Sequence, residues 1–244
     1  MCRVHDVSIT HTVFYHSIEG VDCRHLDLEK KRTKMLEPLM SKLNSRRIVL
    51  ASSSPRRKEL LKNAGITKFE VFSSSFEETV DKSRILDPAS YVKKMACGKA
   101  RDIWRRVCGG TKDLVIGADT IVYLDGRIFE KPKDEADAVS MLSMLSGRTH
   151  TVYTGVCVIF GGEVECDECV FDEETLVTMG DLPFSVIRAY VLTGEPLDKA
   201  GGYGIQGTAC SSLIDKINGS YDNVVGFPTH TFCKVLYDKF GRPE

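Results

Sequence analysis

A serine-rich turn followed by two arginines is the first feature of the sequence that suits chemistry on an anion. The segment Ser52–Arg57 reads Ser-Ser-Ser-Pro-Arg-Arg and follows the apolar run Ile48–Ala51, which predicts a short buried strand. Ser54 can cap a helix that begins at the next residue, and helix N-termini bind anions through free N–H groups and the helix dipole. Because Arg56 and Arg57 oppose that dipole, a bound phosphate would remove an unfavourable contact. A capped helix with a solvated basic face is the alternative.

A carboxylate inside an apolar run is the second candidate. Leu114–Leu124 predicts a buried strand, and Asp119 interrupts it. A buried carboxylate is costly unless it has a partner. At a strand end that lines a cleft, Asp119 would bind a metal ion or activate a water molecule. The alternative is a structural carboxylate that is hydrogen-bonded to a turn.

Two acids and two lysines extend this set of candidate residues. Glu77 and Glu78 are adjacent, and Lys99 lies in a predicted helix that is rich in charge, while Lys131 lies further along the chain. In phosphate chemistry, acids hold a cation and lysines neutralise phosphate oxygens. Taken singly, each of these side chains is more often ordinary surface charge.

A glycine-rich segment and a cysteine pair carry weaker signals. Gly202–Gly207 fits the dinucleotide pattern G-x-G-x-x-G, but that pattern needs a strand before it and a helix after it. The preceding Gly194–Gly201 is typical of a loop, so we interpret Gly202–Gly207 as a loop that can approach a ligand closely, or as a plain surface connection. Cys166–Cys169 is a single C-x-x-C without a second ligand pair, which favours surface thiols over zinc.

The elements that must position these residues alternate between helix and strand, which predicts an α/β fold. Residues 1–45 show no sustained period and are predicted to be an N-terminal extension, whereas residues 46–240 form the regular domain. Asp125 and Gly126 predict a hairpin turn. Helices are predicted at residues 38–43, 55–64, 91–107, 134–145, 183–192 and 231–240, and strands at 48–51, 69–72, 114–124, 149–160 and 169–177.

Composition excludes several classes of function. The chain has 244 residues and a formal net charge of −1, whereas a general electrostatic grip on nucleic acid needs a basic excess or stripe. No apolar run approaches the roughly 18 residues of a membrane span, and the first residues lack the apolar core of a signal peptide. The nine cysteines are scattered and odd in number, which favours reduced thiols in the cytoplasm.

Taken together, these segments resemble the Maf family of nucleotide pyrophosphatases, and especially the Maf-like domain of acetylserotonin methyltransferase-like proteins. The similarity covers residues 46 to about 238 in the order and spacing of the family. The stretches that carry it are Leu50–Leu61, Gly117–Val122, Glu130–Pro132, Leu145–His150, Thr154–Val156, Glu195–Gly207 and Asn223–Pro228.

The resemblance implies a fold, an activity and a substrate. The fold is a mixed, twisted sheet with flanking helices and two lobes around a nucleotide-binding cleft, as in inosine triphosphatases, often in a homodimer. The activity is metal-dependent cleavage of a nucleoside triphosphate between its α and β phosphates, giving a monophosphate and pyrophosphate. One subgroup of the family prefers dTTP and UTP, and its characteristic residues match Arg56, Thr120 and Gln206.

The resemblance also assigns roles. Its catalytic acid matches Asp119, its catalytic lysines match Lys99 and Lys131, and its acidic metal-site residue matches Glu78, which with Asp119 would bind Mg²⁺ or Mn²⁺. Substrate binding then falls to Ser52, Ser54, Arg56, Arg57, Thr120 and Gln206.

The sequence departs from the family pattern at one place, and two other functions stay open. The family often has a further Gly-rich turn after Gly207, but this chain has Thr208–Ser212, which leaves the choice of base open. The activity implied by the resemblance serves nucleotide-pool sanitation. A purine-selective pyrophosphatase is the nearer alternative. A non-enzymatic nucleotide-binding regulator of cell division is the more distant one.

Overall fold

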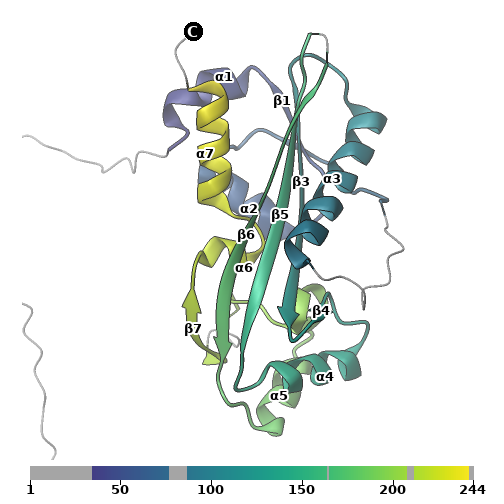
Figure 1. Ribbon diagram of the computed structural model, residues 1–244, viewed down its shortest axis with the longest axis vertical. Helices are drawn as coiled ribbons and strands as arrows, with labels where there is room; N and C mark the ends of the chain where they lie inside the picture. The colour runs from purple at the N-terminus through teal and green to yellow at the C-terminus, as the bar shows by residue number, and fades with distance from the viewer. Residues whose placement is uncertain (1–34, 77–86, 164, 208–211, 242–244) are drawn as a thin grey trace, which may run out of the picture. The chain divides into compact units, whose positions relative to one another are not determined.

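The central sheet is mixed, with strand order β2-β1-β3-β5-β6-β7 and with β4 paired to β3 (Figure 1). The structure is a computed structural model that describes residues 35–76, 87–163, 165–207 and 212–241. β1 is parallel to β2 and β3, whereas the other pairs are antiparallel. The strands are β1 (Arg47–Leu50), β2 (Glu70–Val71), β3 (Asp113–Leu124), β4 (Arg127–Phe129), β5 (Thr149–Phe160), β6 (Asp167–Met179) and β7 (Ile214–Asn218).

Helices pack on both faces of this sheet, which confirms the predicted α/β class with a mixed sheet and flanking helices. β4, β7 and α6 are not among the predicted elements. Among the described residues, no helix is long and apolar enough to cross a membrane. The helices are η2 (Glu37–Leu39), α1 (Met40–Asn44), α2 (Pro55–Ala64), α3 (Pro88–Val107), α4 (Glu135–Leu145), α5 (Phe184–Val191), η4 (Glu195–Asp198), η5 (Ala200–Gly202), α6 (Tyr221–Val225) and α7 (Thr229–Phe240).

β3 has a gap along one edge. β1 pairs with its first half as far as Leu50 opposite Ile116, and β4 pairs with its last residues from Val122 onward. Within the described chain, Gly117–Ile121 therefore lacks a strand partner on that side. On its other side β3 pairs continuously with β5. On this side, the backbone in the middle of β3 is therefore accessible to a ligand.

α3 covers one face of the sheet. Asp87 caps this helix by accepting from the backbone N–H of Ala89 at 3.0 Å and of Ser90 at 3.2 Å. The apolar side of α3 packs against β1, β3 and β5 in two buried clusters. From β3 these clusters take Val115 and Ile121.

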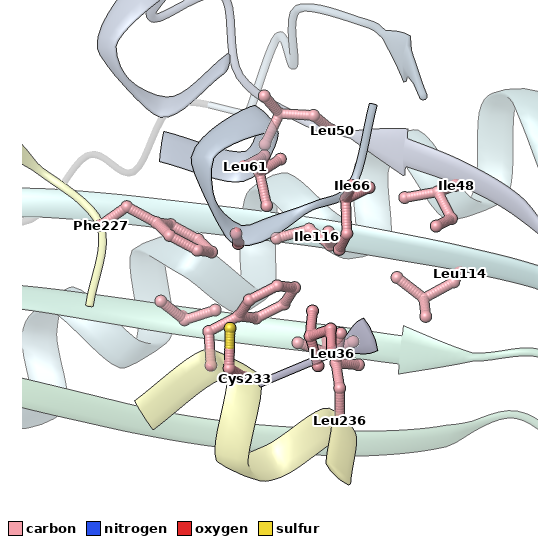
Figure 2. Close-up of a cluster of buried hydrophobic side chains, with 14 of the residues drawn as sticks. Leu36, Ile48, Leu50, Leu61, Ile66, Leu114, Ile116, Phe227, Cys233 and Leu236 are labelled. Carbon is pink, nitrogen blue, oxygen red and sulfur yellow. The ribbon is translucent and has the colours of Figure 1, made fainter. Parts of the chain in front are cut away.

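The opposite face carries a cluster centred on α2 and α7, which Figure 2 shows in close-up. From β3 it takes Leu114, Ile116 and Ala118, which alternate with the residues facing α3, as a strand requires. Its labelled members in Figure 2 are Leu36, Ile48, Leu50, Leu61, Ile66, Leu114, Ile116, Phe227, Cys233 and Leu236.

A second cluster lies further along the same face, under α4 and α5. From β3 it takes Val122 and Leu124, which continue the alternation of Ala118. Thr120 falls between the two clusters, and with Asp119 it is only partly buried in an otherwise buried part of the strand. The helices of this face therefore separate where the edge of β3 is open.

The folded core begins before the predicted start of the regular domain at residue 46. Leu36 just before η2, Leu39 of η2 and Leu43 of α1 are buried in the cluster of α2 and α7. The structure also places a helix over most of the predicted segment 38–43. The rest of the predicted N-terminal extension, residues 1–34, lies outside the described residues.

Two strand glycines allow α3 to approach the sheet closely. A Cβ on Gly117 would lie 2.3 Å from the carbonyl oxygen of Ala96, and one on Gly155 would lie 2.4 Å from that of Val92. Both obstacles are helix backbone, which cannot rotate away. Glycine is therefore required where helix and strand backbones meet.

We predict that Gly155→Ala lowers the free energy of unfolding by about 1–3 kcal/mol, because the added methyl group overpacks the contact with α3. Urea denaturation measures this change. Gly180→Ala is the matched control, since its nearest neighbour would lie 3.4 Å away, at ordinary contact distance. Equal stability of the two variants would contradict the close approach of α3.

Candidate active site

The gap in β3 opens into a cleft with a volume of about 570 Å³. The turn from β1 to α2 lines one side. The other side is lined by residues from Glu195 to Gly207, which include the glycine-rich loop and are called the Gly-rich segment from here on. Asp119 and Thr120 of β3 lie between them, and α3 contributes Lys99. Of the residues predicted to act on a nucleotide, all that the structure describes line this one cleft.

The turn before α2 is built by its serines. The Ser54 side chain caps the helix by accepting from the backbone N–H of Arg57 at 3.5 Å. The buried Ser52 hydroxyl accepts from the backbone N–H of Ser54 at 3.3 Å. Pro55 fits the first position of the helix, and Gly65 ends the helix in a left-handed conformation. The predicted strand, turn and helix are confirmed.

Arg57 joins three segments of the chain. Its Nε donates to the carbonyl oxygen of Gly226 at 2.9 Å, its Nη1 to Ser52 Oγ at 3.1 Å, and its Nη2 to Thr120 Oγ1 at 2.9 Å. Burial lowers the pKa of the guanidinium, while nearby Asp119 acts to raise it. Arg57 therefore ties the turn before α2, β3 and the loop after α6 together, in addition to its predicted contact with phosphate.

Asp119 and Lys99 form an ion pair at the back of the cleft. Lys99 Nζ donates to Asp119 Oδ1 at 2.5 Å, and the two side chains are 24% and 15% exposed, respectively. Asp119 alternates with Thr120 along β3 and so faces α3, which carries Lys99. The ion pair gives the partly buried carboxylate the charged partner that such a position requires.

The Gly-rich segment is folded onto the end of β3. The backbone N–H of Gly201 donates to the carbonyl oxygen of Glu130 at 3.0 Å, and a Cβ on Gly201 would lie 2.8 Å from the Val122 side chain. Gly201 also has a φ of 70°, which favours glycine. This path brings Lys199 and Gln206 to the cleft.

The predicted metal site is described only in part. Asp119 lies in the cleft, whereas Glu77 and Glu78 lie outside the described residues. Among the residues with described positions, no group of three or more acidic, histidine or cysteine side chains is placed to hold a metal ion. Lys131 and Gln206 line the cleft as predicted, and their roles stay predictions.

Sequence reasoning missed a polar network below Thr120. Its hydroxyl lies 3.0 Å from Thr154 Oγ1, which in turn donates to the carbonyl oxygen of Asn223 at 3.2 Å. The buried Asn223 donates from Nδ2 to Val152 O at 3.2 Å and to Thr175 Oγ1 at 3.0 Å. The network supports Thr120 from beneath, and no spacing in the sequence points to it.

A buried histidine was missed as well. His150 Nε2 lies 2.5 Å from the hydroxyl of Tyr203, and the two rings meet edge to face with centroids 5.3 Å apart. Tyr203 belongs to the Gly-rich segment and lines the cleft. Burial lowers the pKa of His150 to about 4, so the imidazole is neutral at physiological pH. The contact holds the Gly-rich segment on β5.

The structure is a mixed α/β protein in which a basic turn, the carboxylate of Asp119 and lysine side chains line one cleft. A model of the family described as Maf-like protein matches residues 47–239, and the chain belongs to this family.

Several curated relatives are similar over most of this chain. A human protein described as a probable bifunctional dTTP/UTP pyrophosphatase/methyltransferase protein is 44% identical over 217 residues, which cover 86% of this chain and 35% of the human one. The chain thus spans about a third of that relative.

Two shorter relatives match almost end to end. The dTTP/UTP pyrophosphatase of Symbiobacterium thermophilum is 46% identical, with 80% of this chain and 95% of that protein covered. That of Thermococcus kodakarensis is 44% identical, with 77% and 94% covered. Among solved structures, the Ham1 protein of Staphylococcus aureus matches with a TM-score of 0.46 and 14% identity, covering 80% of this chain and all of that one.

We expect Arg57→Lys to lower the free energy of unfolding by about 1–3 kcal/mol, because an ammonium cannot satisfy three separated acceptors. Chemical denaturation without ligand measures the loss. Arg101→Lys serves as control, since Arg101 pairs with Glu168 at the surface with its own side chain 50% exposed, and should cost less than about 1 kcal/mol. Similar losses in both variants would refute the linking role of Arg57.

Because His150 is buried as a neutral imidazole, we predict that the free energy of unfolding depends on pH. Its pKa of about 4 in the folded chain lies below the roughly 6.5 of an exposed imidazole, so the unfolded chain takes up the proton first as the pH falls. The contribution of His150 is complete above about pH 6.5 and is lost toward pH 4, by about 3 kcal/mol.

His150→Gln should therefore lose less stability than the wild type between pH 6.5 and 4, as measured by denaturation at a series of pH values. His230→Gln, which removes an exposed imidazole, should keep the wild-type profile. A profile unchanged by His150→Gln would show that another group titrates.

Proposed function

We propose that this protein is a nucleoside triphosphate pyrophosphatase that hydrolyses dTTP, UTP and modified pyrimidine nucleotides to a monophosphate and pyrophosphate. The observation that carries the proposal is the ion pair of Asp119 and Lys99 at the open edge of β3, in the same cleft as the turn before α2. The relatives named dTTP/UTP pyrophosphatase support the substrate. Removal of unwanted nucleotides from the cellular pool fits such an activity.

The reaction is displacement at the α phosphorus. The triphosphate lies against the N-terminus of α2, where Ser52 and Arg57 hold phosphate oxygens. Asp119 accepts a proton from the attacking water, whose oxygen bonds to the α phosphorus. The bond from that phosphorus to the α–β bridging oxygen breaks, and pyrophosphate leaves with the electron pair. Lys99 and Lys131 stabilise the growing negative charge.

We propose a divalent cation, Mg²⁺ or Mn²⁺, as cofactor. In nucleotide enzymes Mg²⁺ is bound by one or two carboxylates together with substrate phosphates and water, so the carboxylate of Asp119 in the cleft fits this chemistry. Asp119 and Glu78 would hold the ion. When bound, the cation neutralises phosphate charge at the reacting centre.

The choice of base is assigned to Thr120, Gln206 and Arg56. A uracil or thymine edge offers donors and acceptors that the amide of Gln206 can match. Gln206 is exposed on the cleft and has room to do so. The Thr120 hydroxyl already contacts Arg57 and Thr154, so its part is to hold the cleft wall in shape beside the base.

We also propose a cytoplasmic location and a homodimer, with no nucleic acid or membrane as partner. The described cysteines are all free, which suits a reducing compartment. The net charge of −1 argues against a general attraction to nucleic acid.

Asp119→Asn should lower turnover of dTTP by at least about 10²-fold, because the amide cannot accept the proton. Binding of dTTP should persist, since the phosphate contacts do not include this side chain. Pyrophosphate release and calorimetric binding measure the two effects. Asp167→Asn, which disrupts a surface pair with Lys239, is the control and should turn over normally.

A panel of nucleoside triphosphates, with and without added Mg²⁺ or Mn²⁺, tests the substrate and the cofactor. We expect pyrophosphate from dTTP and UTP and none after chelation. Preference for purines would replace the substrate assignment. Tight nucleotide binding without pyrophosphate release from any member would indicate a nucleotide-binding regulator instead of an enzyme.

A further inference from the structure

Arg56 spans the cleft to reach the Gly-rich side. Its Nη1 donates to Asp198 Oδ2 at 2.8 Å, and its Nη2 donates to the backbone oxygen of the same residue at 2.9 Å. Arg56 lies in the first turn of α2, and Asp198 ends η4. Two bonds to one partner fix the plane of a guanidinium as well as its position. Arg56 and Arg57 are therefore adjacent in sequence but held by different walls of the cleft.

The surroundings of Arg56 are electrically balanced. Lys199 Nζ contacts Asp198 Oδ1 at 2.8 Å and lies 3.9 Å from Glu195 Oε1. Two cations thus face two carboxylates. Partial burial acts to raise the pKa of Asp198, but hydrogen bonds from Lys199 and Arg56 outweigh it and leave the pKa below its ordinary value. Asp198 is consequently ionised at neutral pH.

The other end of the cleft is positive. There, Arg57 and Lys99 face the single described carboxylate of Asp119, which lies near enough to act on the pKa of Arg57. A triphosphate is attracted to an excess of positive charge and repelled by a carboxylate. The phosphates therefore favour the end at Asp119, and the end at Asp198 suits an uncharged part of the ligand.

We propose that Asp198 is a positioning residue that holds Arg56 for the nucleoside and keeps it from acting as a phosphate ligand. A guanidinium has five N–H donors, of which Asp198 takes two. The remaining donors suit a neutral acceptor such as a carbonyl oxygen of a pyrimidine. Gln206, on the same Gly-rich segment, lines the same cleft. This inference rests on the proposed function, since it assumes a nucleotide in the cleft.

The test compares two ligands that differ by the nucleoside. One is inorganic tripolyphosphate, and the other is α,β-methylene-dTTP, which cannot be cleaved between its α and β phosphates. Their affinities are measured by calorimetry for the wild type, Asp198→Ala, Asp198→Asn, Arg56→Ala, the double variant of Asp198→Ala with Arg56→Ala, and the surface control Asp167→Asn. The ratio of the two affinities isolates the contribution of the nucleoside.

We expect Asp198→Ala and Arg56→Ala each to lower this ratio by about tenfold, with no larger effect in the double variant, because Asp198 acts through Arg56. Asp198→Asn should recover most of the ratio, since its amide oxygen still accepts from Arg56. Asp167→Asn should keep the wild-type ratio. A merely structural role of Asp198 would weaken both ligands equally.

An unchanged ratio in either alanine variant overturns the proposal, because Arg56 would then be a phosphate ligand or would not depend on Asp198. Failure of the wild type to bind the analogue overturns it too. Because no turnover is needed, a wild type that binds the analogue but releases no pyrophosphate from dTTP would defeat the proposed function alone. The ratio would still decide the role of Asp198.

Discussion

The cleft depends on the hydrogen bonds of Arg57. Its three donor nitrogens bind a serine of the turn before α2, a threonine of β3 and a carbonyl oxygen of the loop before α7. These segments come from distant parts of the sequence, and no strand pairing connects them at this point, because the edge of β3 is open there. A partly buried guanidinium loses stability when its donors are left without acceptors. The hydrogen bonds that satisfy Arg57 therefore also fix the walls of the cleft.

The two ends of the cleft differ in charge. α3 brings Lys99 to Asp119 from behind the sheet, while the Gly-rich segment brings Asp198 to Arg56 at the front. Arg57 adds a second positive charge near the pair of Lys99 and Asp119, whereas two cations face two carboxylates around Arg56. An elongated ligand with a highly charged end and a neutral end has one favourable orientation in such a field. In the proposed reaction, this field would direct the phosphates toward Asp119 without any contact to the base.

Much of this arrangement could be predicted from local patterns. The apolar run before Ser52, the cap at Ser54 and the turn at Asp125 and Gly126 each have short-range causes, and the structure confirms those elements. β7 and α6 were missed because both elements are short and largely polar. β7 becomes regular by pairing with β6, and α6 becomes regular where the Ser220 side chain caps it. The partners of Arg57 could not be predicted, since both arginines look alike in sequence. Asn223 and His150 act through tertiary contacts that no spacing reveals.

The three long strands set a mechanical limit on the cleft. β3, β5 and β6 are paired along nearly their whole length, and β3 contributes side chains both to the cluster under α2 and α7 and to the one under α4 and α5. The two groups of helices thus share one stiff support, and a hinge between them would have to bend a continuous ladder of backbone hydrogen bonds. A ligand of the cleft would therefore enter and leave through movements of side chains and of the segments that connect the elements, while the sheet keeps Asp119 and Thr120 fixed on β3.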